Sequence, residues 1–237
     1  MIKIIVGEGE EQQSFNIQER VFTRTSEVFA AHIRNEHLGA SPKGELRFPD
    51  DPVDVWQLLI YWMVEGQLPP ECNDEKESAE PQLVLIRGWI LGDKYDIPQF
   101  QNEVMLALLW VLENATTMSP ESAAVAAAGS LPLSKLHKLV CHQIVRVVYV
   151  KKERDVEEFE RATAVIGLAA ELVSKLDMFH TDFVSGADFV SGYLERGGFS
   201  RDLWRKYMIG DGSRPCSALG PQDESRGEGG AILRHWR

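Results

Sequence analysis

The sequence predicts an α+β fold, with a small N-terminal sheet, a helical cluster and then an all-α extension. Two short apolar segments, residues 2–6 and 14–17, flank a turn rich in Gly and Glu, which predicts a hairpin. A third short apolar segment spans residues 45–48. From residue 53 onward the apolar residues recur mostly at helical spacing. A few short strands followed by a run of helices are typical of the α+β class.

One helix is expected between the hairpin and the third strand. Its apolar positions are supplied by Phe22, Val28, Phe29 and Ile33. Hydroxyl side chains cap the N-termini of helices, so the candidates to begin this helix are Thr23, Thr25 and Ser26. Residues 39–44 are rich in Gly, Ser and Pro, which predicts a loop before the third strand.

The next helix is expected to begin at Asp50-Asp51-Pro52, where two carboxylates would lie at the positive end of its dipole. Its broad apolar face is formed by Val55, Trp56, Leu59, Ile60 and Met63. Gly66 is expected to end it. Residues 71–80 carry five acidic residues and one lysine, a net charge of −4 (1 − 5), which predicts a solvated, mobile loop.

The most informative stretch runs from Gly92 to Asn102, between two apolar helical segments. The apolar positions on its two sides are Leu83, Leu85, Ile86, Trp89 and Ile90, and then Phe100, Val104, Leu108 and Leu112. Pro98 suits the first turn of the second helix, where its missing N–H costs no hydrogen bond. Two helices that meet at a short turn form a packing device, so this stretch argues against catalysis.

The remaining chain is predicted to be helical up to a low-complexity tail. The expected helices cover residues 116–129, beginning at Ser119-Pro120-Glu121, then 131–150 with Leu133 on its apolar face, 155–177 and 181–196. From Gly210 onward Gly, Ser, Pro and Arg dominate, which predicts a disordered tail. The predicted organisation is a domain over residues 1–115, a helical extension over 116–209 and a tail over 210–237.

Composition and charge restrict the classes of partner. Apolar residues make up 44% of the chain and charged residues 26%, as in an ordinary globular protein. The net charge of −11 argues against nucleic acids and anionic membranes, because both are bound through clustered Lys and Arg. No stretch reaches the ~18 apolar residues of a membrane span. Three scattered cysteines are too few for a disulfide framework, so an intracellular location, cytoplasmic or nuclear, is expected.

Several short motifs follow one another in the first part of the chain. They are Phe15-x-Ile17, Ser26-x-x-Phe29, Leu46-x-Phe48 followed by Asp50-Asp51, Leu59-x-Tyr61-Trp62 with Gly66, and Leu91-x-Asp93-Lys94-Tyr95-x-Ile97 with Asn102. Together with the order of the predicted elements, they resemble a BTB/POZ domain of the divergent type common in fungal proteins. The resemblance covers about residues 2–113, roughly the size of one domain.

The resemblance implies a protein–protein interaction module, a scaffold or self-association domain without catalytic activity. Its partners would be proteins, and a second copy of the chain could be one of them, giving a homodimer. The helical extension would enlarge the scaffold. An alternative that the resemblance also implies is a substrate adaptor for a cullin-based ubiquitin ligase. Cullin-recruiting members tend to carry a hydrophobic-x-Glu element after the first long helix. The nearest equivalent is Leu38-Gly39-Ala40, with Ala40 in place of the glutamate.

A metal-dependent enzyme is a third class of function. His137 and Cys141 are four residues apart and would share a helix face, with His142 adjacent. A zinc site needs three or four converging ligands, and no CxxC or HxxxH element completes this one. A buried cysteine with surface histidines is the preferred interpretation. No catalytic, cofactor-binding or metal-binding residue is therefore expected.

Candidate contact residues for a partner come from the aromatic and basic positions. Trp56 and Trp62 are six residues apart and cannot share a narrow helix face, so at least one of them is expected near the surface. Trp204 and Arg205 belong to a basic, aromatic segment, and both residue types are favoured at binding hot spots. A final helix that packs Trp204 onto the bundle is the competing interpretation. The candidates for partner binding are Leu38, Trp62, Trp204 and Arg205.

Overall fold

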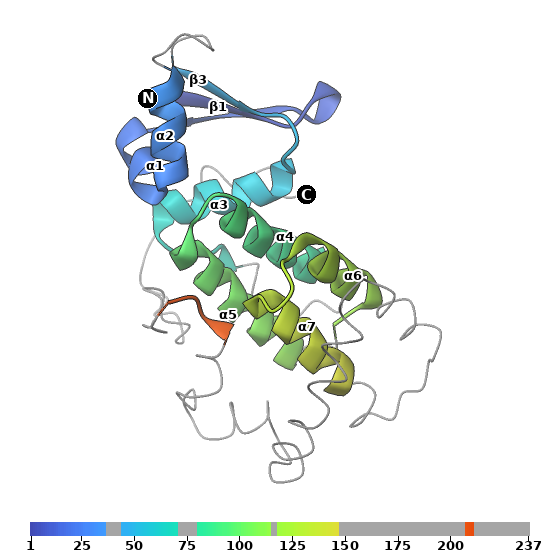
Figure 1. The fold of residues 1–237 in the computed structure, drawn as a ribbon. Coiled ribbons are helices and arrows are strands. Elements are labelled where there is room, and N and C mark those ends of the chain that lie inside the picture. The colour runs from blue at the N-terminus through green and yellow to red at the C-terminus, as the bar shows by residue number, and fades with distance from the viewer. Residues whose placement is uncertain (37–43, 71–79, 115–117, 147–206, 211–237) are drawn as a thin grey trace.

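The computed structural model describes residues 1–36, 44–70, 80–114, 118–146 and 207–210. The strands within these residues are β1 (Ile2–Val6), β2 (Gln13–Ile17) and β3 (Glu45–Phe48), with a short 3-10 helix, η1 (Gly9–Glu11), in the hairpin. The α-helices are α1 (Glu19–Thr25), α2 (Glu27–Glu36), α3 (Val53–Glu65), α4 (Glu80–Lys94), α5 (Pro98–Asn114), α6 (Pro120–Gly129) and α7 (Lys135–Arg146). The sheet lies at one end and the helices extend away from it (Figure 1). The predicted α+β class is confirmed.

The sheet has the order β2-β1-β3, so β1 is its central strand. β1 pairs antiparallel with β2, where Ile4 lies opposite Phe15, and parallel with β3, where Ile4 lies opposite Leu46. The antiparallel pair is the predicted hairpin. The parallel pair is reached through a crossover that contains α1 and α2, as parallel strands require. All three predicted strands are confirmed.

Aromatic rings join the sheet to the helices beside it. The rings of Phe22 and Phe29 stack with their centroids 4.1 Å apart, and the Phe48 ring lies 4.6 Å from that of Trp56. The Tyr95 ring lies 4.9 Å from that of Phe29. These five buried side chains come from α1, α2, β3, α3 and the turn after α4, so they connect elements that are far apart in the sequence.

The single helix predicted around residues 22–33 is two helices, α1 and α2, which meet at Ser26. The Ser26 hydroxyl accepts hydrogen bonds from the N–H groups of Val28 (3.0 Å) and Phe29 (3.4 Å), as an N-cap does. Thr23 and Thr25 instead donate to carbonyl groups one turn earlier in α1. The prediction of one helix was wrong because the capping serine begins a second helix rather than the first.

The predicted boundaries of the later helices are mostly confirmed. α3 ends at Gly66, which has the left-handed φ of +71° that glycine adopts at a helix C-terminus. α5 begins at Pro98. α6 begins after Ser119, whose hydroxyl accepts a hydrogen bond from the Ser122 N–H, with Pro120 in its first turn.

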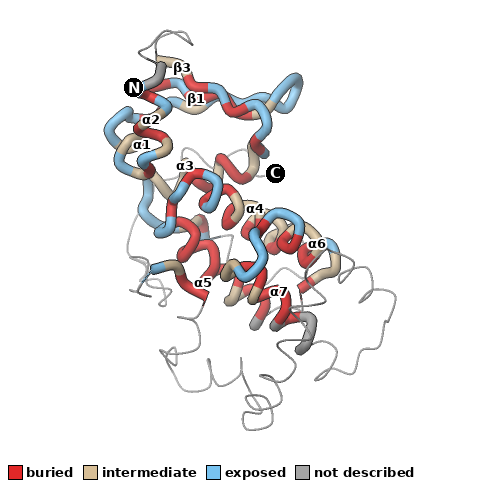
Figure 2. The backbone as a smooth tube through the Cα atoms, in the orientation of Figure 1, coloured by how far each residue is buried: buried red, intermediate tan, exposed pale blue. Residues whose placement is uncertain are grey.

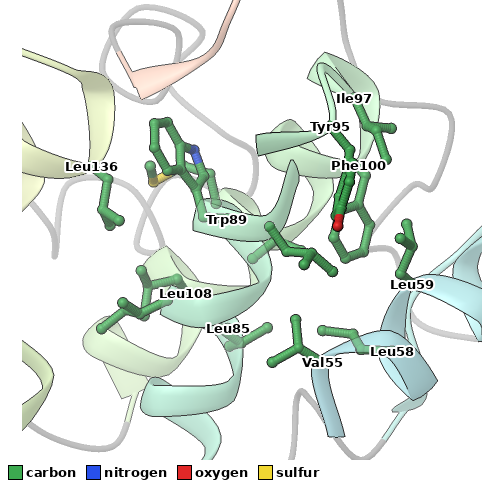
Figure 3. Close-up of a cluster of buried hydrophobic side chains, with 14 of the residues drawn as sticks. Val55, Leu58, Leu59, Leu85, Trp89, Tyr95, Ile97, Phe100, Leu108 and Leu136 are labelled. Carbon is green, nitrogen blue, oxygen red and sulfur yellow. The ribbon is translucent and has the colours of Figure 1, made fainter. Parts of the chain in front are cut away.

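Helix α4 lies between α3, α5 and α6 and contacts all three. Its contact with α6 is close, because a Cβ atom at Gly129 would lie only 2.4 Å from the Cδ1 atom of Ile90. Figure 3 shows the resulting core, which runs from Leu58 on α3 past Trp89 on α4 to Leu136 on α7. Apolar residues on both sides of the predicted domain boundary therefore belong to one hydrophobic cluster.

Several predicted segments lie outside the described residues. They are the loop at residues 39–43, the acidic loop up to residue 79, the helices predicted at 155–177 and 181–196, and the tail beyond residue 210. Within the described ranges, none of the helices combines the length and the apolar character needed to cross a bilayer.

Candidate interaction site

The Asp93-Lys94-Tyr95 motif lies beside a buried carboxylate, Asp51, whose side chain is only 4% exposed. Its Oδ2 atom accepts hydrogen bonds from the Tyr95 hydroxyl (2.5 Å) and from Trp56 Nε1 (2.8 Å). Its Oδ1 atom accepts from Lys94 Nζ (2.6 Å). Asp51 lies at the start of α3, as expected, just before the N-cap Pro52. It is also the centre of a polar cluster formed with side chains up to 44 residues away, which was not expected.

Ser26 extends this cluster to α2. Its hydroxyl donates to the Tyr95 carbonyl (2.5 Å) while it caps α2. Burial raises the pKa of the Tyr95 phenol above its ordinary value of 10.0, and the hydrogen bond to Asp51 raises it further. Tyr95 therefore stays protonated and donates to the carboxylate, which makes it a poor base or nucleophile. The cluster fastens α2, α3 and α4 to one another, and the motif has a structural role.

Two of the three candidate metal ligands on α7, His137 and Cys141, are buried in the core. His137 and Cys141 are 1% and 0% exposed, so they share the inward face of α7. The expected surface position of His137 was wrong, because the four-residue spacing that aligns it with the buried cysteine also turns it inward. The side chain of His142 lies outside the described set. Nowhere in the described residues do three His, Cys, Asp or Glu side chains converge as metal ligands would.

Among the residues that the structure describes, the most exposed large apolar side chains after Met1 belong to the turn between α6 and α7, the leucine turn (Leu131-Pro132-Leu133). Leu131 is 71% exposed and Leu133 is 65% exposed. Figure 2 shows this connection in pale blue, between the buried parts of the two helices. The two leucines place two large apolar side chains on one exposed turn, which makes the turn a candidate contact surface.

Hydrogen bonds fix the conformation of the leucine turn. The Ser134 N–H donates to the Leu131 carbonyl (3.0 Å), and the Ser134 hydroxyl accepts from the His137 N–H (3.1 Å). Leu133 has a φ of +68°, a left-handed conformation that costs a non-glycine residue about 1–2 kcal/mol. Backbone strain of this kind is concentrated at functional sites, so Leu133 is a candidate contact residue.

The sequence-based prediction placed these leucines in a helix over residues 131–150, and that start was wrong. α7 begins only at Lys135, because Pro132 and the capping Ser134 interrupt the helical pattern. Leu133, Leu136 and Val140 fit a helical apolar spacing, which concealed the turn. The proline and the serine after it were the available signal.

Among the predicted contact residues, Trp62 is the one that the structure describes. It is half-buried at the end of α3, and its ring centroid lies 5.4 Å from that of Phe100 on α5. Trp56 is fully buried, so Trp62 is the more exposed of the two tryptophans, although it packs against the core. Val64, close to Trp62 in the sequence, is 56% exposed. Leu38, Trp204 and Arg205 lie outside the described residues, so their roles stay predictions.

Comparison with known proteins gives no independent assignment. No protein-family model matches the chain, and no match is found among curated proteins.

Proposed function

We propose that this chain is a non-catalytic protein–protein interaction module of the BTB/POZ type, which binds partners, a second copy among them, through the leucine turn. The observation that carries the proposal is the exposure of Leu131 and Leu133 on a turn of fixed conformation. Leu38, the residue on which the cullin-adaptor alternative depends, is not described, so that alternative stays a prediction.

The order of elements supports the BTB-type assignment. A hairpin, a helical crossover, a third strand parallel to β1 and the helices α3, α4 and α5 follow one another in the order that the resemblance implies. Three of the motifs that carry the resemblance also contact one another, because Ser26, Asp51, Lys94 and Tyr95 are joined by hydrogen bonds.

The energetics favour an apolar contact as the source of affinity. Burying one exposed leucine side chain contributes about 1.5–3 kcal/mol, and a turn that is already ordered loses little conformational entropy on binding. Two copies that each carry a net charge of −11 repel one another. Self-association must therefore come from apolar surface, and it is expected to strengthen with salt as this repulsion is screened.

The proposal predicts that the wild-type protein forms a dimer that loses affinity when the leucine turn is charged. Gel filtration coupled to light scattering, across an about tenfold concentration range, should give a mass approaching twice 26.7 kDa. The Leu131→Glu/Leu133→Glu variant should stay near 26.7 kDa, because a buried, unpaired carboxylate opposes association. Both residues are exposed, so this variant should fold normally.

A charge change elsewhere on the surface is the control. Val64→Glu introduces one carboxylate at another exposed apolar position, at the end of α3, and should leave the dimer intact. A wild-type monomer at all concentrations that also retains no protein from a cell extract would contradict the proposal. Failure to bind a purified cullin N-terminal region at micromolar concentration would remove the adaptor alternative.

A further inference from the structure

Four residues near the C-terminus, Tyr207 to Gly210, dock on α5 although they lie about a hundred residues further along the chain. The Asn102 side chain holds the backbone of Ile209 at two points. Its Nδ2 atom donates to the Ile209 carbonyl (3.1 Å), and its Oδ1 atom accepts from the Ile209 N–H (2.7 Å). Figure 1 shows the segment beside α5.

Two side chains of this segment are buried in the core of the protein. Tyr207 is 2% exposed and Met208 is 1% exposed, and both belong to the hydrophobic core cluster. On α5, Met105 and Leu106 follow Asn102 by about one turn, so they lie on the same side of the helix, and both are buried. We call the Asn102 side chain and the buried surface of α5 beside it the clamp. Asn102 makes two hydrogen bonds to the Ile209 backbone, and Tyr207 and Met208 are buried in the same core cluster as Met105 and Leu106.

The last residue of the segment sets a conformational requirement. Gly210 has a φ of +83°, which residues other than glycine adopt only with strain. It is exposed, and a Cβ atom added there would meet no described atom within 4 Å. Glycine is therefore favoured by backbone conformation rather than by lack of space. The Ile209 side chain is only partly buried, whereas its backbone makes both hydrogen bonds.

We propose that Asn102 and the adjoining surface of α5 form a peptide-binding site, whose ligands are segments of the form aromatic–Met–x–Gly. In this chain the occupant is its own Tyr207–Gly210. In this site the hydrogen bonds to the Ile209 backbone would supply register, and burial of the two adjacent side chains, Tyr207 and Met208, would supply specificity. This site deepens the proposed interaction function, on which its biological meaning rests, but it is separate from the leucine turn.

The test weakens the hold of the site on its own segment, in the chain of 237 residues, and then offers it a peptide. Ile209→Pro removes the backbone N–H that donates a hydrogen bond to Asn102 Oδ1. The side chains of Tyr207 and Met208 are unchanged. A labelled peptide with the sequence of residues 205–212 is then titrated, and binding is followed by fluorescence anisotropy. We expect the Ile209→Pro protein to bind it at least about tenfold more tightly than the wild type, whose site is already filled.

Two controls isolate the clamp. Adding Asn102→Leu to the Ile209→Pro protein should weaken peptide binding about tenfold, and so should N-methylation of the isoleucine in the peptide, because each removes the backbone contact. Gln57→Leu makes a similar amide-to-leucine change at a side chain that donates a hydrogen bond to Gln13, and it should leave peptide binding unchanged. Equal binding by the wild-type and Ile209→Pro proteins, or by the variants with and without Asn102, would overturn the proposal.

Hydrogen exchange tests the same site without depending on the fold of the Ile209→Pro variant. The Ile209 amide should be protected in the wild type and should lose about tenfold of that protection in Asn102→Leu. Unchanged protection would overturn the clamp. The Leu131→Glu/Leu133→Glu variant should keep the Ile209 amide protected. The experiment can therefore contradict the peptide-site proposal without affecting the proposal for the leucine turn, and the reverse.

Discussion

Replacing Asp51 with alanine is expected to lower the free energy of unfolding by about 3–5 kcal/mol, the cost typical of breaking a buried charge cluster. The carboxylate is 4% exposed and accepts three hydrogen bonds. Its removal leaves the Tyr95 hydroxyl and the Trp56 indole N–H without an acceptor in the core, and each unsatisfied donor costs about 1–3 kcal/mol. Lys94 is half exposed and can turn to water, so it adds little.

Asp50 provides a matched control for this experiment. It is the preceding residue, it is exposed, and its replacement by alanine makes the same change in net charge. Urea denaturation of the two variants should show an effect within about 0.5 kcal/mol for Asp50→Ala. Similar small losses for both variants would mean that the Asp51 cluster does not hold the fold together.

Alkaline pH should destabilise the protein through two buried tyrosines. Burial raises the pKa values of Tyr95 and Tyr207 above the ordinary 10.0, and the Asp51 hydrogen bond adds to the effect at Tyr95. The folded state then holds protons that the unfolded chain releases above pH 10. The free energy of unfolding should therefore be insensitive to these groups below about pH 9 and fall by about 1.4 kcal/mol per pH unit for each tyrosine above pH 10.

The contribution of Tyr95 can be separated from that of the lysines, which titrate in the same range. Tyr95→Phe removes the phenol, so the fall in unfolding free energy between about pH 10 and 11 should be smaller by about 1 kcal/mol, because the unfolded tyrosine is only half ionised at pH 10. The stability of this variant at neutral pH will be lower because the hydrogen bond to Asp51 is lost, and the slopes are what should be compared. An unchanged slope would show that Tyr95 ionises without cost in the folded protein.

Local patterns predicted the elements well where the determining residues are neighbours in the sequence. The strands at residues 2–6 and 45–48 follow from short apolar segments, and the start of α6 follows from Ser119-Pro120. The break at Ser26 was also signalled locally, but a hydroxyl residue inside an apolar pattern can begin a helix or interrupt one. The pattern alone did not decide between one helix and two.

The features that carry the proposals depend on contacts between distant residues. Asp51 was assigned to a helix dipole because its partners Lys94 and Tyr95 lie more than forty residues away. Asn102 was noted only as part of a motif, and nothing near it in the sequence indicates Ile209 as its partner. Leu133 was placed in a helix because its apolar spacing outweighed the adjacent Pro132. Burial and backbone strain at such positions emerge only when the chain is folded.

The most direct test of the proposed interaction function is the Leu133→Gly variant, because it separates binding from folding. Glycine adopts the φ of +68° without strain, so the free energy of unfolding should stay the same or rise by up to about 1 kcal/mol. Removal of the apolar side chain should weaken self-association about tenfold or more, as buried leucine contacts are worth more than about 1.4 kcal/mol.

Asp96→Gly is the matched control, since Asp96 is exposed and also has a positive φ, +51°, but offers no apolar contact. It should relieve strain in the same way and leave association unchanged. Association constants from sedimentation equilibrium, measured beside urea denaturation curves for both variants, give the answer. The account predicts weaker association without loss of stability for Leu133→Gly alone. Unchanged association of that variant would contradict it.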